Sequence, residues 1–376
     1  DLLDAKFIFT PSSSTPSNSF EIDEEGYFCY KSQVEHGWYS GALTVLYEDI
    51  SFTLDGEIQI FVPTTPIADS LANQSWESII ELIDNLGLNI MKDIYNVETF
   101  VGTKKKIILQ PTADALNKFE YEVMIIGEND DYLDEQETQT ANFTFQFCNV
   151  ISDLNGNPLT TSVDPLYGQP EHYWQAKIQD TLNSTQNKAM WAVNGEWDDV
   201  TYKRSVYQMI LDGDNLIGSN IKPVYRKALC YNEFTGSWSI QKSQTKLFLP
   251  SLSNIFSHDG LVKTINDNPD LNEDNVEMYC LEGQQYDLYH NVIGDQAFAT
   301  HETSSGGITT IPTEFDILNR KTINGYEDTY YLLSTNNIGV SVPGYFNFNW
   351  FIDKNSTTSL STDLPGGYSL APCFCI

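Results

Sequence analysis

Lysine and arginine are scarce in this chain of 376 residues, which contains 20 of them against 52 aspartates and glutamates. The formal net charge is −32 at pH 7. Nucleic-acid binding depends on clustered Lys and Arg side chains that neutralise phosphates, and the only such cluster here is Lys104, Lys105 and Lys106. The composition therefore argues against nucleic acid as a partner, and the acidic surface favours solubility.

Long hydrophobic runs and paired cysteines are also missing. No window approaches the roughly 18 to 20 consecutive apolar residues that a membrane span requires, so we predict no membrane partner. The six cysteines lack the C-x-x-C spacing of a structural zinc site. We expect reduced thiols that act as small hydrophobic residues. They are Cys29, Cys148, Cys230, Cys280, Cys373 and Cys375.

Recognisable catalytic frames are absent as well. The five histidines lie far apart, and none belongs to H-E-x-x-H or accompanies G-x-S-x-G. Carboxylate pairs such as Asp198 and Asp199 arise by chance among 52 acids, so proximity in sequence does not indicate a glycosidase. We predict no catalytic residues and no enzymatic activity.

Residues 1–73 are predicted to form a small β module. After a Ser/Thr/Pro-rich stretch, short strands are expected at Gly26–Tyr30, Ala42–Tyr47 and Ile58–Val62. In the last of these, Ile58, Ile60 and Val62 alternate with Gln59 and Phe61, as in a half-buried strand. The stretch Pro63-Thr64-Thr65-Pro66 then interrupts the pattern, and we place the domain boundary at about residue 73.

Residues 74–376 are predicted to form one α+β domain with long structured loops. Ser75 is placed to cap a helix that ends at Gly87, and a second helix is expected at Val200–Leu211 with Asp199 as its cap. Strands are expected at Lys106–Leu109, Tyr121–Ile126 and Asn142–Phe147, where Phe143, Phe145 and Phe147 share one face. The acidic run Glu128–Glu137 is expected to be a solvated loop.

A series of short motifs in this second region resembles a domain family of unknown function that is frequent in phages and prophages of Firmicutes and in gut metagenomes. The motifs occur in the family's order. They are Ser75-Trp76-Glu77, Val101-Gly102-Thr103-Lys104, Val123-Met124-Ile125-Ile126-Gly127, Asn194-Gly195-Glu196-Trp197 with Arg204, Ile221-Lys222-Pro223-Val224, Lys246-Leu247-Phe248-Leu249-Pro250-Ser251, Gly283-Gln284-Gln285-Tyr286 and Ala371-Pro372-Cys373-Phe374-Cys375-Ile376.

The family is similar to the C-type-lectin and formylglycine-generating-enzyme superfold, so the resemblance implies an irregular C-type-lectin-like domain after the N-terminal β module. We expect Trp76, Trp197, Phe248, Pro250, Trp350 and Phe374 to belong to its structural core. Where the family has Trp-Leu-Arg-Ser, this chain has Tyr331-Leu332-Leu333-Ser334. The reactive cysteine arrangement of the enzymatic branch is also missing. A shared fold does not by itself transfer a function.

Calcium is the one cofactor that we keep as an alternative to none. Gln169-Pro170-Glu171 and Trp197-Asp198-Asp199 resemble the calcium motifs of C-type lectins only loosely. The segment Asn266–Asp274 alternates oxygen-bearing side chains, but Leu271 stands where an EF-hand needs glycine. Sequons beginning at Asn73, Asn142, Asn183 and Asn355 would suit a glycosylated secreted protein, yet four are close to chance in an Asn-rich chain.

The resemblance implies a phage virion surface protein, in a tail fibre, tail tip or head decoration, whose C-terminal domain recognises a host-surface glycan or protein. Residues 1–73 would attach it to other virion proteins, and a homotrimer is expected by analogy with phage receptor-binding proteins. Two alternatives remain. One is a cell-surface or extracellular bacterial adhesin that uses the same domain, and the other is an enzyme of the formylglycine-generating type.

The predicted ligand-binding surface lies in the aromatic run from Tyr345 to Asp353. Strand alternation places Phe346, Phe348, Trp350 and Ile352 on a core-facing side. The opposite side carries an aromatic ring beside amide and carboxylate groups, which together suit stacking on a sugar and hydrogen bonding to it. Its residues are Tyr345, Asn347, Asn349 and Asp353.

Overall fold

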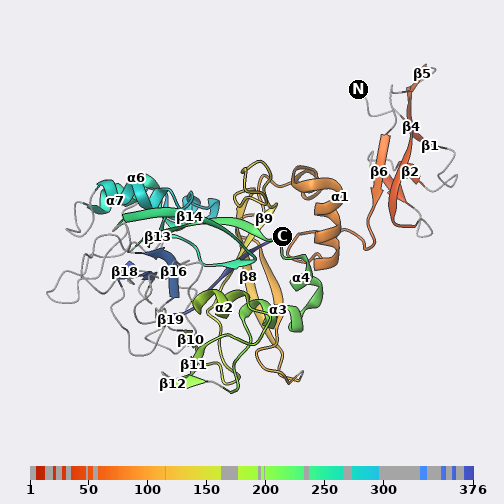
Figure 1. Ribbon diagram of the computed structural model, residues 1–376. Coiled ribbons are helices and arrows are strands. Elements are labelled where there is room, and N and C mark those ends of the chain that lie inside the picture. The colour runs from red at the N-terminus through yellow and green to blue at the C-terminus, as the bar shows by residue number, and fades with distance from the viewer. Residues whose placement is uncertain are drawn as a thin grey trace. The chain divides into compact units, whose positions relative to one another are not determined.

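The computed structural model describes residues 6–12, 20–22, 28–30, 35–47, 50–53, 58–114, 116–161, 177–193, 196–198, 200–232, 237–265, 273–295, 331–336, 349–352, 358–360 and 368–376 (Figure 1). The chain divides into two compact units, Asp1–Val97 and Glu98–Ile376. Among the described residues, no helix has the length and apolar character needed to cross a bilayer.

The N-terminal unit is organised around the long strand β4 (Gly37–Tyr47), which pairs antiparallel with β1 (Lys6–Pro11), β5 (Ile50–Thr53) and β6 (Ile58–Val62). A separate hairpin joins β2 (Phe20–Ile22) to β3 (Phe28–Tyr30). Phe9 and Val62 form a small core against which Ile58 and Ile60 pack. The predicted alternation at Ile58–Val62 is thereby confirmed.

The helix α1 (Trp76–Tyr95) belongs to this N-terminal unit, so the unit extends past the boundary predicted at residue 73. Hydrogen bonds join the helix to the preceding strands and turn. Trp38 Nε1 donates to Asn85 Oδ1 at 3.2 Å, and the Thr64 amide donates to Glu81 Oε2 at 3.0 Å. The Pro63–Pro66 stretch is therefore a turn within the unit rather than a linker.

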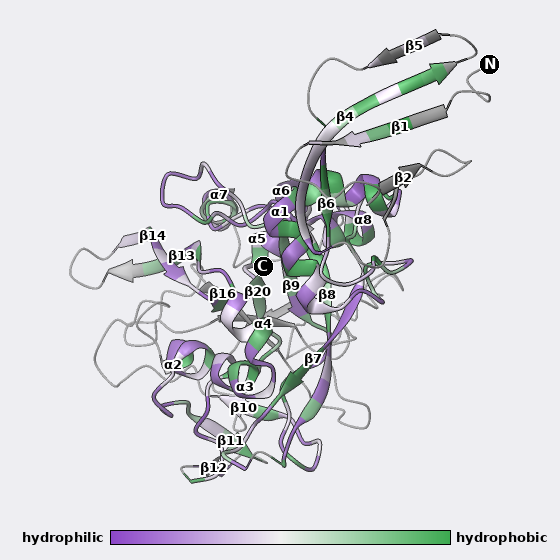
Figure 2. Cartoon of the chain, turned by 90° about the vertical axis from the view of Figure 1, so that its right-hand side faces the viewer, coloured by the Kyte–Doolittle hydropathy of each residue, from purple (hydrophilic) through white to green (hydrophobic). Residues whose placement is uncertain are grey.

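The start of α1 is predicted correctly, but its predicted end is wrong. The Ser75 side chain caps the helix by accepting the Ser78 amide at 3.2 Å. Gly87 has φ 76°, which glycine adopts without strain, and it kinks the helix instead of ending it. Beyond the kink, Leu88 and Met91 are buried, so apolar burial carries the helix on to Tyr95. Figure 2 shows hydrophobic and hydrophilic residues alternating along α1.

The second unit contains an antiparallel five-stranded sheet with the order β15-β20-β9-β8-β7. The strands β7 (Lys104–Leu109), β8 (Phe119–Glu128) and β9 (Phe143–Phe147) were expected from the sequence, although with slightly different ends. The C-terminal strand β20 (Cys373–Cys375) pairs with β9 on one side and with β15 (Leu247–Phe248) on the other. The last residues of the chain thus lie inside the sheet.

Aromatic packing holds this sheet together. Phe145 and Phe374 are register partners on neighbouring strands, and their rings stack with centroids 5.3 Å apart. Phe143 and Phe147 pack edge-on against the same pair. All four side chains are fully buried, which agrees with the predicted shared face of Phe143, Phe145 and Phe147.

The second unit also contains a seven-stranded sheet with the order β12-β11-β10-β19-β16-β17-β18. Its neighbours are antiparallel except for β16 and β19, which run parallel. The strands are β10 (Leu159–Thr161), β11 (Trp191–Val193), β12 (Glu196–Asp198), β16 (Tyr331–Asn336), β17 (Asn349–Ile352), β18 (Thr358–Leu360) and β19 (Tyr368–Ser369).

Helices and one long hairpin surround the two sheets, so the second unit has the predicted α+β character. The hairpin joins β13 (Val224–Asn232) to β14 (Ser237–Thr245), while α3 packs against β7 and α8 against β8. The helices are α2 (Lys177–Asn183), α3 (Val206–Gly213), α4 (Asn215–Asn220), α5 (Leu252–Ile255), α6 (His258–Ile265), α7 (Glu273–Cys280) and α8 (Asp287–Ile293).

The helix predicted at Val200–Leu211 begins later than expected, at Val206. The Asp198 carboxylate accepts the backbone N–H groups of Val200, Thr201 and Tyr202, which holds this segment in a turn. Ser205 caps the helix instead, accepting the Gln208 amide at 3.0 Å. Asp198 therefore has a structural role, because it holds the turn before α3.

Candidate functional site

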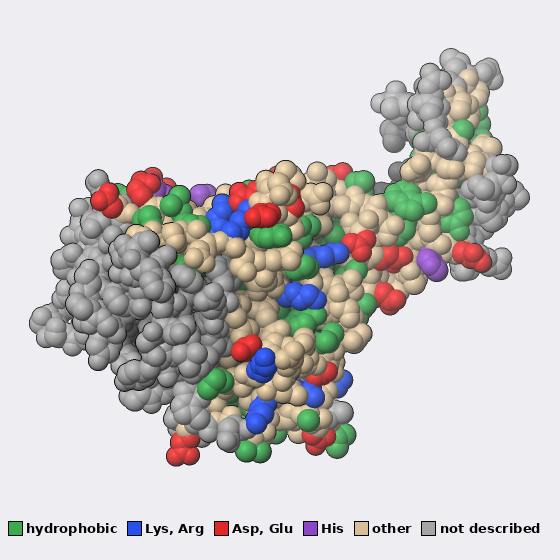
Figure 3. All heavy atoms as spheres, in the orientation of Figure 1, with side chains coloured by type: hydrophobic (Ala, Val, Ile, Leu, Met, Phe, Trp, Pro, Cys, Tyr) green, Lys and Arg blue, Asp and Glu red, His purple; other side chains and the backbone are tan. Residues whose placement is uncertain are grey.

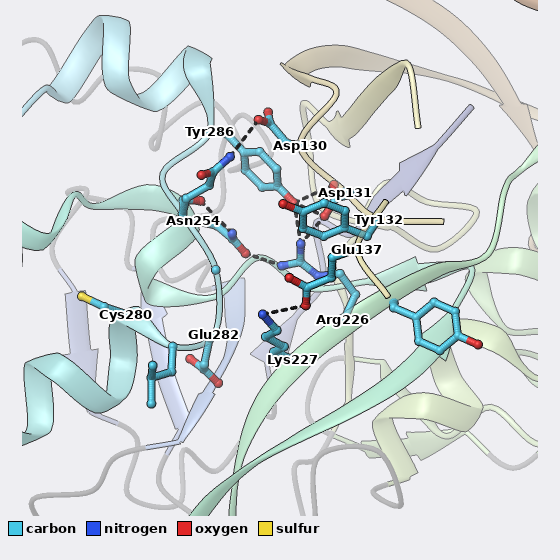
Figure 4. Close-up of a pocket in the computed structure, with 14 residues that line it drawn as sticks. Asp130, Asp131, Tyr132, Glu137, Arg226, Lys227, Asn254, Cys280, Glu282 and Tyr286 are labelled. Atoms are coloured by element: carbon cyan, nitrogen blue, oxygen red, sulfur yellow. Dashed lines mark hydrogen bonds and ion pairs between the residues drawn. The ribbon is translucent and has the colours of Figure 1, made fainter. Parts of the chain in front are cut away.

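A cavity of about 300 Å³ lies within the second unit, where segments far apart in the sequence meet. Its lining comes from the loop after β8, from β13, from α5, and from the end of α7 together with the turn that leads into α8. Figure 4 shows Asp131, Asn254 and Tyr286 around Arg226, with Cys280 farther from it. Side-chain polar groups dominate the lining, so the cavity is suited to a ligand with many hydrogen-bonding groups.

Arg226 forms the floor of the cavity. Alternation along β13 turns Val224, Arg226 and Ala228 inward, and all three are buried. The guanidinium donates to Asp131 Oδ1, to Asn254 Oδ1 and, at 3.0 Å, to the Tyr286 hydroxyl. It also lies over the Phe248 ring, 4.3 Å from the centroid.

Asp131 is the counter-ion of Arg226, and only 1% of its surface is exposed. Its Oδ2 accepts the Thr144 hydroxyl at 2.6 Å and the Tyr286 hydroxyl at 2.9 Å. Burial raises the pKa of Tyr286 well above its usual value, so this hydroxyl stays protonated and donates. The predicted solvated loop Glu128–Glu137 is therefore wrong at Asp131, because the buried cation requires a buried partner.

Asp130 occupies a different environment beside this ion pair. Its Oδ1 accepts Gln284 Nε2 at 3.3 Å, whereas Oδ2 is buried and has no hydrogen-bond partner among the described residues. Burial raises the pKa of Asp130 to about 7, and the Asp287 and Asp131 carboxylates add to the rise. Near neutral pH the group therefore titrates between a carboxylic acid and a carboxylate.

A glycine makes this arrangement of Asp130 sterically possible. Gly127 lies at a register irregularity in β8, where a bulge bends the strand. A Cβ atom at this position would overlap Asp130 Oδ2 and would lie 2.8 Å from Tyr286 Cδ1. The residue must therefore be glycine for the Asp130 carboxyl to pack against the strand.

The rim of the cavity carries a second set of charges. Glu137 Oε1 lies 2.8 Å from both Lys227 Nζ and Lys242 Nζ. These three side chains are between 21% and 36% exposed, so solvent screens their attraction. Tyr132 and Tyr225, both half-buried, are joined by a hydrogen bond of 2.8 Å from the Tyr225 amide to the Tyr132 carbonyl. Tyr132 and Tyr225 thus line the cavity together with Glu137, whose charge is paired with the two lysines.

The remaining wall is built by α5 and by the turn before α8. Asn254 donates through Nδ2 to the Gln284 carbonyl at 3.0 Å, and its Oδ1 also accepts the Ser251 amide at 2.9 Å. Glu282 is 2% exposed, and its Oε1 accepts the Leu229 amide at 2.8 Å. These polar groups are fixed by bonds within the protein, so the wall is preformed.

The thiols near this site are poor nucleophiles at neutral pH. Burial raises the pKa of Cys280, which lines the cavity, to about 11, and Glu277 adds to the rise. Burial also raises the pKa of Cys375, whose Sγ lies 3.5 Å from Asp131 Oδ2. The thiolate is the reactive form of cysteine, so neither group is prepared for attack. Cys148, Cys230, Cys280, Cys373 and Cys375 are all free thiols.

The metal motifs considered from the sequence fall mostly outside the described residues. Gln169-Pro170-Glu171 and positions 266–272 lie there, and Asp198 is committed to the turn before α3. Across the part of the chain that the structure describes, no three His, Cys, Asp or Glu side chains are grouped as a metal site needs.

Of the four predicted ligand-binding residues, Tyr345, Asn347 and Asp353 lie outside the described residues. Asn349 is in β17 together with Trp350, and the side chains of both also lie outside the description. The backbone pairs Trp350 with Leu360 and Asn349 with Asn336. The run is thus a strand where it is described, and the assignment of its faces stays a prediction.

The expected core residues have different positions. Phe248, Pro250 and Phe374 are buried next to the five-stranded sheet, where Phe248 also contacts Arg226. Trp76 begins α1 and is only half-buried, because the inward face of this helix starts at Ser78. Trp197 pairs through its backbone with Ala192, and its side chain lies outside the description.

The one basic cluster is neutralised within its own sheet. Lys104 Nζ lies 3.0 Å from Glu122 Oε2, and Lys106 Nζ lies 2.8 Å from Glu120 Oε1. Lys105 faces inward and is 7% exposed. On the face seen in Figure 3, the described Lys and Arg side chains are scattered rather than joined in one patch.

No family model matches the chain, and no curated protein or solved structure matches it either.

Proposed function

We propose that this chain is a phage virion surface protein that attaches to the particle through its N-terminal unit and recognises a host-surface glycan or protein through its second unit. The preformed polar cavity of the second unit carries this proposal. Binding residues are commonly placed on loops that a rigid scaffold holds in position, and the cavity has this construction. A cell-surface or extracellular adhesin is the alternative with the same binding chemistry.

Several motifs that carry the resemblance to the phage family lie in the second unit, whereas Ser75-Trp76-Glu77 begins α1 in the N-terminal unit. The Leu-Phe-Leu-Pro-Ser block forms β15, and the closing Ala-Pro-x-Phe-Cys-Ile segment forms β20, which pairs with it. Lys222 of another motif bridges to Cys375, and Val123–Gly127 lies in β8 of the same sheet. The motifs named here lie in or beside one sheet of the second unit, and Tyr286 of the Gly-Gln-Gln-Tyr motif lines the cavity.

The N-terminal unit has a surface that suits attachment to other proteins. Register in the four-stranded sheet places Ile8 and Trp38 on the face opposite Phe9, and they are 46% and 48% exposed. Trp38 packs on Phe61 of the neighbouring strand, with ring centroids 5.2 Å apart. An exposed aromatic and aliphatic surface on a small β unit is typical of a protein contact.

The enzymatic alternative finds little support in the described residues. Chemistry of the formylglycine-generating type needs a reactive thiol, and burial raises the pKa values of Cys280 and Cys375. Thiol labelling combined with activity assays on peptide substrates would distinguish an enzyme from a binding protein.

The proposed role predicts competition at the host surface. Purified full chain, added before infection, should reduce adsorption of the phage that encodes it, because free chains occupy the same receptors. Chain unfolded by heating is the control and should have no effect. If saturating folded chain left adsorption unchanged, the host-recognition role would be refuted.

Assembly is tested separately. We propose a homotrimer, since repeated attachment of weak sites raises the overall avidity. Light scattering on the intact chain at micromolar concentration should give three times the 42.5 kDa monomer mass. A monomer mass would remove the trimer from the proposal without affecting the binding site.

A further inference from the structure

We propose that the cavity floored by Arg226 binds a single uncharged sugar ring, such as one residue of a host-surface glycan. The inference rests on the proposed recognition function and specifies its ligand and its site. This site differs from the run Tyr345–Asp353, which the sequence alone favours. The size of the cavity, its charge balance and its polar groups lead separately to this ligand class.

Size suits a small ligand. Ligand cavities in proteins span about 300 to 1,000 Å³, and the cavity here, at about 300 Å³, lies at the lower limit. The half-buried Tyr132 and Tyr225 and the Leu281 side chain, which is 54% exposed, stand at the rim. A longer glycan would therefore place one residue inside and extend past these apolar groups.

Charge argues against an anionic ligand. Arg226 is neutralised by Asp131, and Lys227 is paired with Glu137. The lining also contains the carboxyl groups of Asp130 and Glu282, so both described cations of the lining have acidic neighbours. An incoming carboxylate or phosphate would meet compensated cations and further acids. An uncharged ligand avoids this repulsion.

The hydrogen-bonding groups suit hydroxyls. The lining contains the exposed Gln284 amide and the hydroxyls of the half-buried Tyr132 and Tyr225, groups that both donate and accept hydrogen bonds. Asn254 and Tyr286 are each 1% exposed and are bonded within the protein. Sugar hydroxyls also donate and accept, and apolar sugar faces pack on aromatic rings. Asn254 is held by Ser251 and donates to the Gln284 carbonyl, so it fixes the backbone of the segment that presents the Gln284 amide. Figure 4 shows Asn254, Tyr286 and Tyr132 around one region beside Arg226.

Two variants of the full chain test the site by blocking it. Leu281→Trp places a larger side chain at the rim, while Leu116→Trp makes the same change at a residue of the same unit that is 90% exposed and outside the lining. Saturation-transfer NMR is recorded with D-glucose, D-galactose, L-rhamnose, N-acetyl-D-glucosamine, D-glucuronic acid and D-glucosamine. Gln284→Ala serves as a third variant that removes a polar group without adding bulk.

The expected result is binding of at least one of the four uncharged sugars, weakened at least tenfold by Leu281→Trp and at least threefold by Gln284→Ala. Leu116→Trp should leave the affinity within twofold of the unmodified chain. The proposal is overturned if no uncharged sugar binds, if only glucuronic acid or only glucosamine binds, or if Leu281→Trp binds normally. Binding of glucosamine alone would assign the cavity to a cation.

Thiol protection keeps the test decisive if Leu281→Trp fails to fold. Cys280 lines the cavity and is partly accessible, whereas Cys148, Cys230, Cys373 and Cys375 are buried. A saturating uncharged sugar should slow maleimide labelling of Cys280 at least fivefold at pH 8.5, with the labelled peptide identified by mass spectrometry. Unchanged labelling in the presence of a sugar that binds would place that sugar elsewhere and overturn the assignment.

The two proposals can fail separately. If the chain blocks phage adsorption but no uncharged sugar binds, the ligand assignment fails and host recognition stands. If a sugar binds in the cavity but the chain does not affect adsorption, the cavity assignment stands and the virion role fails.

Discussion

Removing the charge of Arg226 should destabilise the second unit strongly, because it leaves Asp131 buried without its counter-ion. In Arg226→Met, a side chain of similar length fills the space and cannot donate hydrogen bonds. Asp131, at 1% exposure, keeps only the Tyr286 and Thr144 hydroxyls and the Cys375 thiol as donors. Breaking one partner of a buried ion pair costs about 3 to 5 kcal/mol. Asp131→Asn should cost a similar amount, since it leaves the guanidinium unpaired.

The double variant separates the ion pair from general packing. Arg226→Met combined with Asp131→Asn contains neither buried charge, and the introduced amide oxygen would still accept from the Tyr286 and Thr144 hydroxyls. We therefore expect the double change to cost about as much as one single change. The coupling energy between the two sites should then be about 3 kcal/mol, at the upper end for residues in contact.

Urea unfolding followed by pulsed thiol labelling measures the stability of the second unit alone, and so gives the cost of each variant. Cys148, Cys230, Cys373 and Cys375 are buried there and become reactive when the unit opens. The urea concentration at the unfolding midpoint should shift, while the slope of the unfolding free energy against urea concentration stays constant. The slope is constant because the surface exposed on unfolding is nearly unchanged. If each single variant cost less than about 1 kcal/mol, or if the two costs simply added, the role assigned to this ion pair would be wrong.

Four further variants test other parts of the structure. The raised pKa of Asp130, about 7 against an ordinary 3.8, means that the folded state binds more protons between these values. The contribution of Asp130 to the free energy of unfolding therefore falls by up to about 4 kcal/mol as pH rises from 4 to 7. Urea titrations at a series of pH values should show this fall as the difference between the wild-type protein and Asp130→Asn. Asn183→Ala should destabilise the second unit by about 1 to 3 kcal/mol in thermal unfolding, because the Asn183 side chain accepts the Leu247 amide and donates to the Leu247 carbonyl. An unchanged stability would contradict those contacts. Trp350→Ala should lower the free energy of unfolding by about 3 to 5 kcal/mol as a large-to-small core change. The double variant Asn347→Ala with Asn349→Ala should change it by no more than about 0.5 kcal/mol. The reverse ranking in the same assay would show that the faces of this strand are assigned wrongly.

The sequence predicts those features that depend on neighbouring residues. Ser75 is recognisable as a helix cap because its side chain reaches the Ser78 amide three positions later. The strands around Ile58–Val62 and Phe143–Phe147 follow from alternation of apolar residues. The later start of α3 could not be predicted in this way, since Asp198 bonds three following amides and holds a turn that competes with a helix.

The candidate cavity was not predicted, because its residues meet only through the tertiary fold. Asp131, Arg226 and Tyr286 are far apart in the sequence, and none belongs to a readable catalytic motif. One local signal was present. Arg226 occupies the same side of its strand as Val224 and Ala228, and an arginine on an apolar strand face needs a buried acidic partner. Which of the 52 acids it finds is decided by packing.

Mass spectrometry of purified phage particles tests the central claim most directly. Particles banded in a density gradient, from the phage that encodes the chain, should yield peptides from both units, for example from the segments around α1 and β13. Their abundance should stay constant relative to the major capsid protein across the particle peak. Peptides found only in the host envelope or culture medium, and absent from the particle peak, would contradict the virion assignment and favour the adhesin.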